Sequence, residues 1–295
     1  MTRSYRYAVY IVLGAVVLLM LSPIYWLVQT SLKSPAEMAS FPPTWWPSAP
    51  RFGNYSEAVT SVNFVGALQN SLTIAFITTI LTTLSSAWVG FGFARLTAPG
   101  KKQLFVVLLS TMMLPGIVTL VPTYLIFAKL HMVNTYWPWV AWGLGGSAFL
   151  IFLFRQFFAG IPKEMEEAAI IDGCGYVGIF WRIFLPQSWP VIAASVILSF
   201  TGAWGDFVGP AMFLSQDSTT LAVAMASGYV NDKGLPLNNL VAAGAVMYVL
   251  PVLVLFMFMQ RRFVSGFSTS GTRRFSLAQA SCRMPVTCQL TLTLG

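Results

Sequence analysis

Long apolar runs alternate with short polar connections along almost the whole chain. A helix that crosses the hydrocarbon core of a bilayer needs about 20 mostly apolar residues, because each residue rises about 1.5 Å through a layer of about 30 Å. The pattern therefore predicts an all-α integral membrane protein with six transmembrane helices. The six apolar segments run approximately from Tyr7 to Val28, Ala67 to Phe93, Leu104 to Ala128, Trp137 to Phe158, Pro190 to Leu214 and Leu240 to Met259.

The composition agrees with this pattern. Of the 295 residues, 56% are hydrophobic and 9% are charged, whereas soluble domains carry about 25% charged residues. Too little polar surface remains to cover a water-soluble globule, and the apolar content excludes a disordered chain. The first apolar segment is long and lacks a small-x-small cleavage site followed by a soluble domain, so we interpret it as a retained span and not as a signal peptide.

The positive charges indicate the orientation. Basic residues accumulate on the cytoplasmic side of membrane proteins. With the amino terminus inside, thirteen of the seventeen Lys and Arg residues fall in inner segments, and only Lys33, Arg51, Lys129 and Lys233 fall in outer ones. We therefore expect a multi-pass protein of the plasma (inner) membrane with both termini in the cytoplasm. This asymmetry also accounts for the net charge of +8 without a nucleic-acid partner.

One outer connection is unusual in composition. The segment Ser34–Pro50 is rich in proline and contains Trp45 and Trp46. Its prolines disfavour a regular helix. We expect an extended segment that lies over the outer face, where it has either a packing role, which we favour, or a binding role.

The chain lacks the motifs that would power or catalyse a reaction. It contains no G-x-x-x-x-G-K-[ST] phosphate loop, no H-E-x-x-H and no G-x-S-x-G. Its single histidine, His131, has no second histidine with which to share a metal, so we expect no metal site and no catalytic residues. Ion-coupled carriers carry several ionisable groups inside their spans, whereas Asp206 is the one acidic residue well inside a predicted span. We therefore expect the driving energy to come from another chain.

The connection from Ala159 to Trp189 has the local chemistry of two short helices. Pro162 suits the first helical position, and the glutamates that follow suit a helix N-terminus. Gly173 can adopt the left-handed conformation that ends a helix. The spacing then predicts a second helix from Tyr176. Its apolar face would comprise Val177, Phe180, Trp181 and Phe184.

A family resemblance rests on this connection. Seven residues match the pattern E-A-A-x3-G-x9-I-x-L-P position for position, namely Glu167, Ala168, Ala169, Gly173, Ile183, Leu185 and Pro186. The pattern is that of permease subunits of binding-protein-dependent ABC importers. The chain resembles their carbohydrate-type branch, which is maltose and glycerol-phosphate permease-like, over roughly residues 5 to 271. The stretches that contribute are Asn70–Ser71, Phe93–Leu96, Pro99–Lys101, Met113–Pro115, Pro122, Asn134–Thr135 and Gln260–Gly266.

The resemblance implies a type I importer permease fold and a mechanism. Two permease subunits form the pathway, two cytoplasmic ATPase subunits bind ATP and Mg, and an extracytoplasmic solute-binding protein delivers the solute. The first short helix of the loop is then the coupling helix, which sits in a cleft of the ATPase. The seven matched residues are therefore candidate ATPase-coupling residues, and this chain itself is not an enzyme.

The candidate translocation-path residues are Asn70, Trp204, Asp206 and Phe207. Asp206 is expected in the outer half of the fifth span, where a carboxylate must face protein or a wet cavity. It either lines the path or is locked to a neighbouring helix. The aromatic residues either stack on a sugar ring or pack in the core. Pro115 and Pro122 are expected to bend the third span.

The expected organisation has three parts. Residues 1–66 hold the first span and outer loop, residues 67–264 hold the permease core with the coupling loop 159–189, and residues 265–295 form a cytoplasmic tail without an assigned role. The expected function is the permease subunit of an ATP-driven importer of a sugar or sugar-like solute. The alternatives are an importer for another solute class, such as a polyamine, an ion-coupled secondary transporter and a membrane-bound enzyme.

Overall fold

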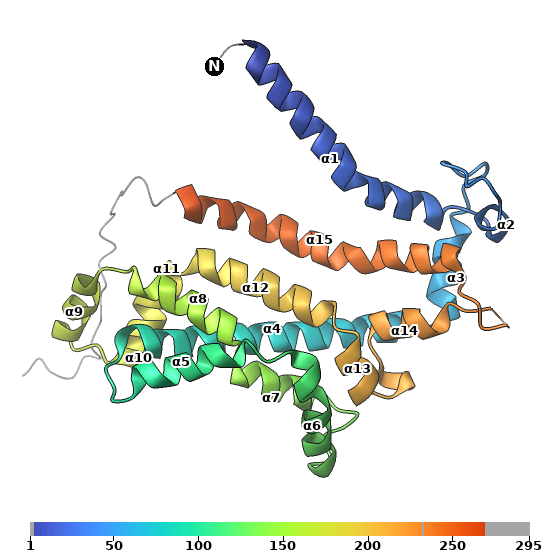
Figure 1. The fold of residues 1–295 in the computed structure, drawn as a ribbon. Coiled ribbons are helices and arrows are strands. Elements are labelled where there is room, and N and C mark those ends of the chain that lie inside the picture. The colour runs from blue at the N-terminus through green and yellow to red at the C-terminus, as the bar shows by residue number, and fades with distance from the viewer. Residues whose placement is uncertain (1–2, 232, 269–295) are drawn as a thin grey trace, which may run out of the picture. The chain divides into compact units, whose positions relative to one another are not determined.

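The regular structure is helical throughout the part of the chain that the computed structural model describes, residues 3–231 and 233–268 (Figure 1). The predicted all-α class is therefore confirmed for these residues. The helices of the first half are α1 (Arg3–Ser31), α2 (Pro35–Met38), α3 (Gly53–Ser61), α4 (Phe64–Arg95), α5 (Lys101–Thr111), α6 (Gly116–Lys129), α7 (Trp137–Gly145) and α8 (Ala148–Ala159). Those of the second half are α9 (Lys163–Ile171), α10 (Tyr176–Ile179), η1 (Phe180–Phe184), α11 (Leu185–Gln187), α12 (Trp189–Trp204), α13 (Val208–Phe213), η2 (Gln216–Ser218), α14 (Leu221–Gly228) and α15 (Asn238–Ser268).

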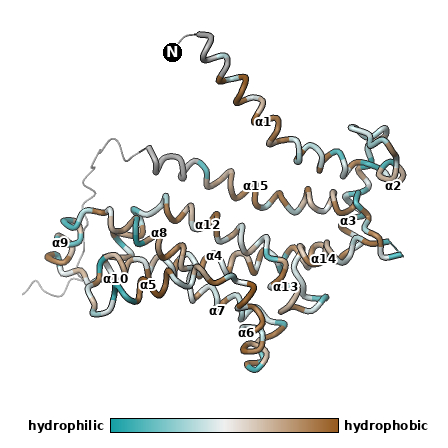
Figure 2. Tube along the Cα trace, viewed as in Figure 1, coloured by the Kyte–Doolittle hydropathy of each residue, from teal (hydrophilic) through white to brown (hydrophobic). Residues whose placement is uncertain are grey.

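Several of these helices have the length and apolarity needed to cross a bilayer. Four segments qualify alone, and they are Val9–Ser31, Phe64–Arg95, Trp137–Ala159 and Asn238–Gln260. Two further pairs qualify if each counts as one bent span, α5 with α6 at 98° and Tyr176–Gln187 with α12 at 82°. The hydropathy colouring in Figure 2 follows the same segments, with hydrophobic colours along α1 and α15. Each of the six apolar runs overlaps one of these candidates, although the fifth candidate begins at Tyr176, inside the predicted loop, and ends at Trp204.

The third and fifth spans are interrupted. The break between α5 and α6 ends at Pro115, where a bend was predicted, whereas α6 continues through Pro122. The prediction of one uninterrupted span from Pro190 to Leu214 is wrong at its outer end, because α12 stops at Trp204 and α13 begins at Val208. The Asp206 carboxylate accepts a hydrogen bond from the Gly209 N–H at 3.0 Å. This local bond offers the backbone an alternative to a continued helix.

The helices form two compact units, which are described separately. The first unit comprises the described residues up to Phe76, together with Leu120–Pro138 and Phe200–Phe256. The second comprises Ile77–Thr119, Trp139–Ser199 and the described residues from Met257 onward. α15 extends to Ser268, and the rest of the predicted tail 265–295 lies outside the described residues.

One carboxylate, that of Glu37, links the two ends of the proline-rich loop in the first unit. Contrary to the prediction of a fully extended segment, Pro35–Met38 forms the single turn α2, because a proline at the first helical position loses no hydrogen bond. Glu37 accepts hydrogen bonds from the Ser34 N–H at 2.9 Å and from the Ser48 N–H at 2.8 Å, joining the two ends of the loop. The hydrogen bonds from Ser34 and then Ser48 lower the pKa of Glu37 to about 2.

Candidate functional site

The first short helix of the coupling loop 159–189, which carries the seven signature residues of the E-A-A-x3-G-x9-I-x-L-P pattern, forms where the sequence predicts it. α9 spans Lys163–Ile171, and Pro162 occupies the position immediately before the first helical residue, one residue earlier than predicted. Glu164 and Glu166 lie in the first turn, where the partial positive charge of the helix N-terminus favours carboxylates.

Gly173 ends this helix as predicted. Its φ of 81° lies in the left-handed region that glycine adopts without steric cost. The Gly173 N–H donates to the Ile170 carbonyl, and the Cys174 N–H donates to the Ala169 carbonyl, both at 2.9 Å. These two bonds form a Schellman motif, which satisfies carbonyls that the helix end would otherwise leave unpaired.

A cluster of buried apolar side chains lies beneath the loop in the second unit. Its members come from the end of α4, from α8, from α9 and from the segment 179–191, and they are Ala87, Phe91, Phe154, Phe158, Ile161, Ala169, Ile179, Phe180, Ile183, Phe184 and Val191. Aromatic rings dominate the contacts, and Phe91 and Phe184 meet at 5.0 Å between ring centroids. α9 rests on this cluster through Ala169, with Met165 packed against it.

The buried face of the second short helix differs from the predicted apolar face. Phe180 and Phe184 are buried as predicted, but Val177 and Trp181 are 60% and 50% exposed. Ile179 and Ile183 take the two inner positions instead. The residues from Phe180 to Phe184 form a π-helical turn between α10 and α11. Because this segment is apolar on every side, helical spacing alone did not determine which face turns inward.

The signature residues divide into an exposed and a buried group. On α9, Glu167 and Ala168 are exposed, whereas Ala169 is only 4% exposed. Ile183 is also buried, Leu185 is half-buried and Pro186 is exposed. Next to Glu167 and Ala168, Ile171 is 85% exposed. The outward face of α9 therefore presents a carboxylate, a small side chain and an unburied apolar side chain.

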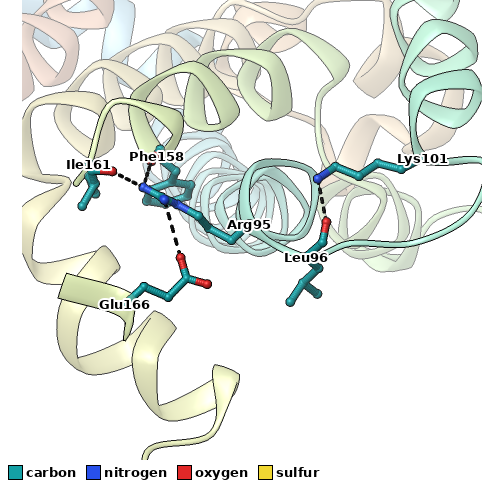
Figure 3. Close-up of polar contacts among 6 residues, drawn as sticks. All are labelled: Arg95, Leu96, Lys101, Phe158, Ile161 and Glu166. Carbon is teal, nitrogen blue, oxygen red and sulfur yellow. Dashed lines mark hydrogen bonds and ion pairs between the residues drawn. The ribbon is translucent and has the colours of Figure 1, made fainter. Parts of the chain in front are cut away.

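Sequence reasoning missed the residue that ties this helix down. Arg95, the last residue of α4, is 5% exposed in its side chain, and its Nη1 lies 3.5 Å from Oε2 of Glu166 on α9 (Figure 3). Its Nη2 donates to the Phe158 carbonyl at 2.6 Å and to the Ile161 carbonyl. Removing one partner of a buried ion pair typically costs about 3–5 kcal/mol. An arginine at the end of a long apolar helix is the sequence feature that could have identified it. This residue entered the sequence-based predictions only within the stretch Phe93–Leu96.

Two of the candidate path residues, the buried Trp204 and the half-buried Asn70, are held by contacts within the first unit. Trp204 is buried, stacks on Phe200 and on Tyr248, and donates from Nε1 to the Tyr248 carbonyl at 3.1 Å. Asn70 donates from Nδ2 to the Thr219 carbonyl at 3.2 Å and accepts from the Tyr136 hydroxyl at 2.7 Å. Thr219 in turn lines a cavity of 460 Å³, with Asn63, Gln216 and other residues around it.

The other two candidates lie in the break between α12 and α13. Asp206 is half-buried and caps α13 through the Gly209 N–H, and Phe207 is 45% exposed. None of the four candidates is among the residues that line the 460 Å³ cavity. The structure thus places all four in one unit.

Comparison with known proteins identifies the family. Residues 86–269 match the family described as binding-protein-dependent transport system inner membrane component. The chain belongs to this family. The sequence-based recognition is therefore confirmed, and the protein is a multi-pass permease of the inner membrane that works with other components of an ABC transport system.

Relatives and a solved structure agree with this assignment. The permease is 31% identical over 280 residues to the arabinooligosaccharides transport system permease protein AraQ of Bacillus subtilis (strain 168), covering 91% of this chain and 96% of that one. It is 33% identical over 257 residues to the melibiose/raffinose/stachyose import permease protein MelC of the same strain, covering 85% and 91%.

A crystal structure of a bacterial ABC transporter involved in the import of the acidic polysaccharide alginate contains a chain of the same fold. The TM-score is 0.77 at 20% identity, covering 89% of this permease and 99% of that chain. The predicted type I importer permease fold is therefore confirmed.

The left-handed conformation of Gly173 generates a first prediction. A side chain with a Cβ costs about 1–2 kcal/mol in this conformation, so Gly173→Val should loosen the end of α9. We expect the α9 amides of the purified protein to exchange hydrogen roughly tenfold faster than in the wild type. Gly175→Val is the matched control, because Gly175 has a φ of −74° and no atom lies within 4 Å of an added Cβ. Equal exchange in the two variants would contradict the assignment of the cap.

Proposed function

We propose that this permease, with a second permease subunit, forms the translocation path of an ATP-driven importer for a sugar or sugar-like solute. Family membership and relatives named for arabinooligosaccharide and melibiose import support the solute class. The coupling loop indicates ATP-driven transport but carries no information about the solute. Another solute, such as a polyamine, is therefore the alternative that direct transport assays must exclude.

The observation that carries the proposal is the outward face of α9. A helix of nine residues is anchored on its inner side by the aromatic cluster and leaves Glu167, Ala168 and Ile171 open to contact. The small Ala168 permits close approach by another surface, and the Glu167 carboxylate suits a charge-assisted hydrogen bond from a basic side chain. We propose that the seven signature residues act as the coupling site, with Glu167 and Ala168 in contact with an ATPase subunit.

The remaining components follow from this role. Two ATPase subunits bind ATP and Mg and hydrolyse the nucleotide, and this chain contributes no catalytic residue. An extracytoplasmic solute-binding protein delivers the solute to the outer side. α9 must then face the cytoplasm, which agrees with the orientation expected from the distribution of basic residues, with both termini inside.

We also propose that Asn70, Trp204, Asp206 and Phe207 form part of the wall of the path. The exposed ring of Phe207 and the adjacent Asp206 carboxylate suit contact with a polar solute that carries apolar ring faces. Trp204 and Asn70 support this region through their hydrogen bonds within the unit.

The path assignment predicts a specific effect of Asp206→Asn. The amide oxygen can still accept the Gly209 N–H, so the cap survives while the negative charge is lost. We expect the transport rate in proteoliposomes to fall roughly tenfold, equivalent to about 1.4 kcal/mol of lost stabilisation, with unchanged amounts of assembled protein. A normal rate would mean that Asp206 serves only as a cap.

The coupling assignment predicts a specific effect of Glu167→Arg. The side chain is exposed, so the substitution should leave folding intact while placing a positive charge against a basic partner. We expect solute uptake and solute-stimulated ATP hydrolysis by the reconstituted importer to fall roughly 100-fold, which is the effect of losing about 2.7 kcal/mol.

Glu57→Arg on α3 is the control for this experiment, because it makes the same charge change at an exposed position of the other unit. It should leave both activities unchanged. The proposal is wrong if no ATPase co-purifies with the wild-type permease, or if Glu167→Arg and Glu57→Arg behave alike.

A further inference from the structure

The side chain of Arg95 joins the end of α4 to three segments that lie more than 60 residues later in the sequence. Its backbone belongs to α4, its two carbonyl acceptors lie at and just beyond the end of α8, and its ion-pair partner Glu166 lies on α9. The third of these segments is η1, because the Arg95 Cζ lies 4.9 Å from the centroid of the Phe184 ring. Figure 3 shows the side chain reaching from the end of α4 towards Phe158, Ile161 and Glu166.

The site is well matched to a positive charge. The last carbonyls of a helix lack partners within the helix and carry a partial negative charge. Phe158 contributes a carbonyl from the last turn of α8, which also accepts the Ile161 N–H at 3.2 Å, and the Ile161 carbonyl lies just beyond the helix. The Arg95 side chain therefore caps α8 and pairs with Glu166 at the same time.

The backbone on either side of Arg95 is also held in place. Lys101 donates from Nζ to the Leu96 carbonyl at 2.6 Å and so closes the turn that follows α4 (Figure 3). Phe91, one turn before Arg95, is 2% exposed and belongs to the aromatic cluster. A force applied to the guanidinium thus reaches the body of the unit.

Short non-helical connections join α9 to its neighbours. Residues 160–162 lie between α8 and α9, and residues 172–175 lie between α9 and α10. Two hydrogen bonds hold Gly173 in the motif that ends α9. Side chains on the inner side of α9 add further contacts, and among them are Met165, Ala169 and Glu166, which is paired with Arg95 of α4.

We propose that Arg95 is a positioning residue that fastens α9 to the ends of α4 and α8, so that a movement imposed on the outer face of α9 is passed directly to these two helices. The inference rests on the proposed coupling function, and it adds a residue outside the coupling loop. Glu167 receives the partner, whereas the neighbouring Glu166 connects the helix to the transmembrane body.

The chemistry of the two side chains shows how to test this role. An arginine offers several N–H donors in a rigid planar fork, whereas a lysine offers a compact ammonium that cannot reproduce the fork. Arg95→Lys keeps the charge but cannot serve both carbonyls and the carboxylate in the same geometry. Glu166→Gln keeps the size and a hydrogen-bonding group but removes the charge. Glu164→Gln is the matched control, because Glu164 is exposed in the same first turn of α9.

The decisive measurement is the number of solute molecules imported per ATP hydrolysed by the complete importer in proteoliposomes. A merely structural defect reduces the amount of active complex and lowers both rates together, which leaves this ratio unchanged. We expect the ratio to fall roughly tenfold in Arg95→Lys and Glu166→Gln, within the range typical of coupling between distant sites, while Glu164→Gln keeps the wild-type ratio. The ATPase should co-purify with each variant.

The double variant sharpens the test. If the two residues act through one another, Arg95→Lys combined with Glu166→Gln should lower the ratio no further than either single substitution. A wild-type ratio in Glu166→Gln overturns the inference, and this variant decides alone if Arg95→Lys does not assemble. Failure of the proposed function is a different result, because the wild-type protein would then lack an ATPase or solute-dependent hydrolysis.

Discussion

A packed layer of aromatic rings stabilises the conformation of the coupling loop between α8 and α12. Phe91, Phe158, Phe180 and Phe184 meet with ring centroids 5.0–6.4 Å apart, mostly edge to face. Each well-placed aromatic pair contributes about 0.5–1.5 kcal/mol beyond the area that it buries. The short helices have little stability of their own, because isolated helices below about 12 residues are marginal in water. They exist because this layer supports them.

This constraint explains why neighbouring residues of α9 have different roles. Ala169 faces the rings and must be small to let the helix lie close to them, whereas Ala168 faces outward and leaves room for another surface. Glu166 turns inward to Arg95, and Glu167 turns outward. A nine-residue helix thus presents one face to the transmembrane body and another to the medium. Such a two-faced element is suited to passing a displacement from a partner to the spans.

The sequence was sufficient for features that depend on local chemistry. The apolar runs predicted the helices, and Gly173 was predicted as the helix end because a glycine after an acidic first turn and a short helix is a typical stop. Sequence was insufficient where the outcome depended on contacts between distant residues. Arg95 meets carbonyls 63 and 66 residues away, and no local pattern identifies them.

Other errors have equally physical causes. The inner face of the second short helix was misassigned because Val177 and Trp181 are as apolar as the residues that are buried. The fifth span was predicted too long because apolarity does not register the hydrogen bond by which Asp206 caps α13. The positions of Asn70 and Trp204 follow from partners distant in the sequence, Tyr136 and Tyr248, which periodicity cannot pair.

The most direct test of the central claim is a structure of the intact assembly purified from membranes. The account predicts that α9 lies in a cleft of a nucleotide-hydrolysing subunit on the cytoplasmic side, with Ala168 at the contact and Glu166 still paired to Arg95. An assembly without such a subunit, or one in which α9 lies on the outer side of the membrane, would contradict it.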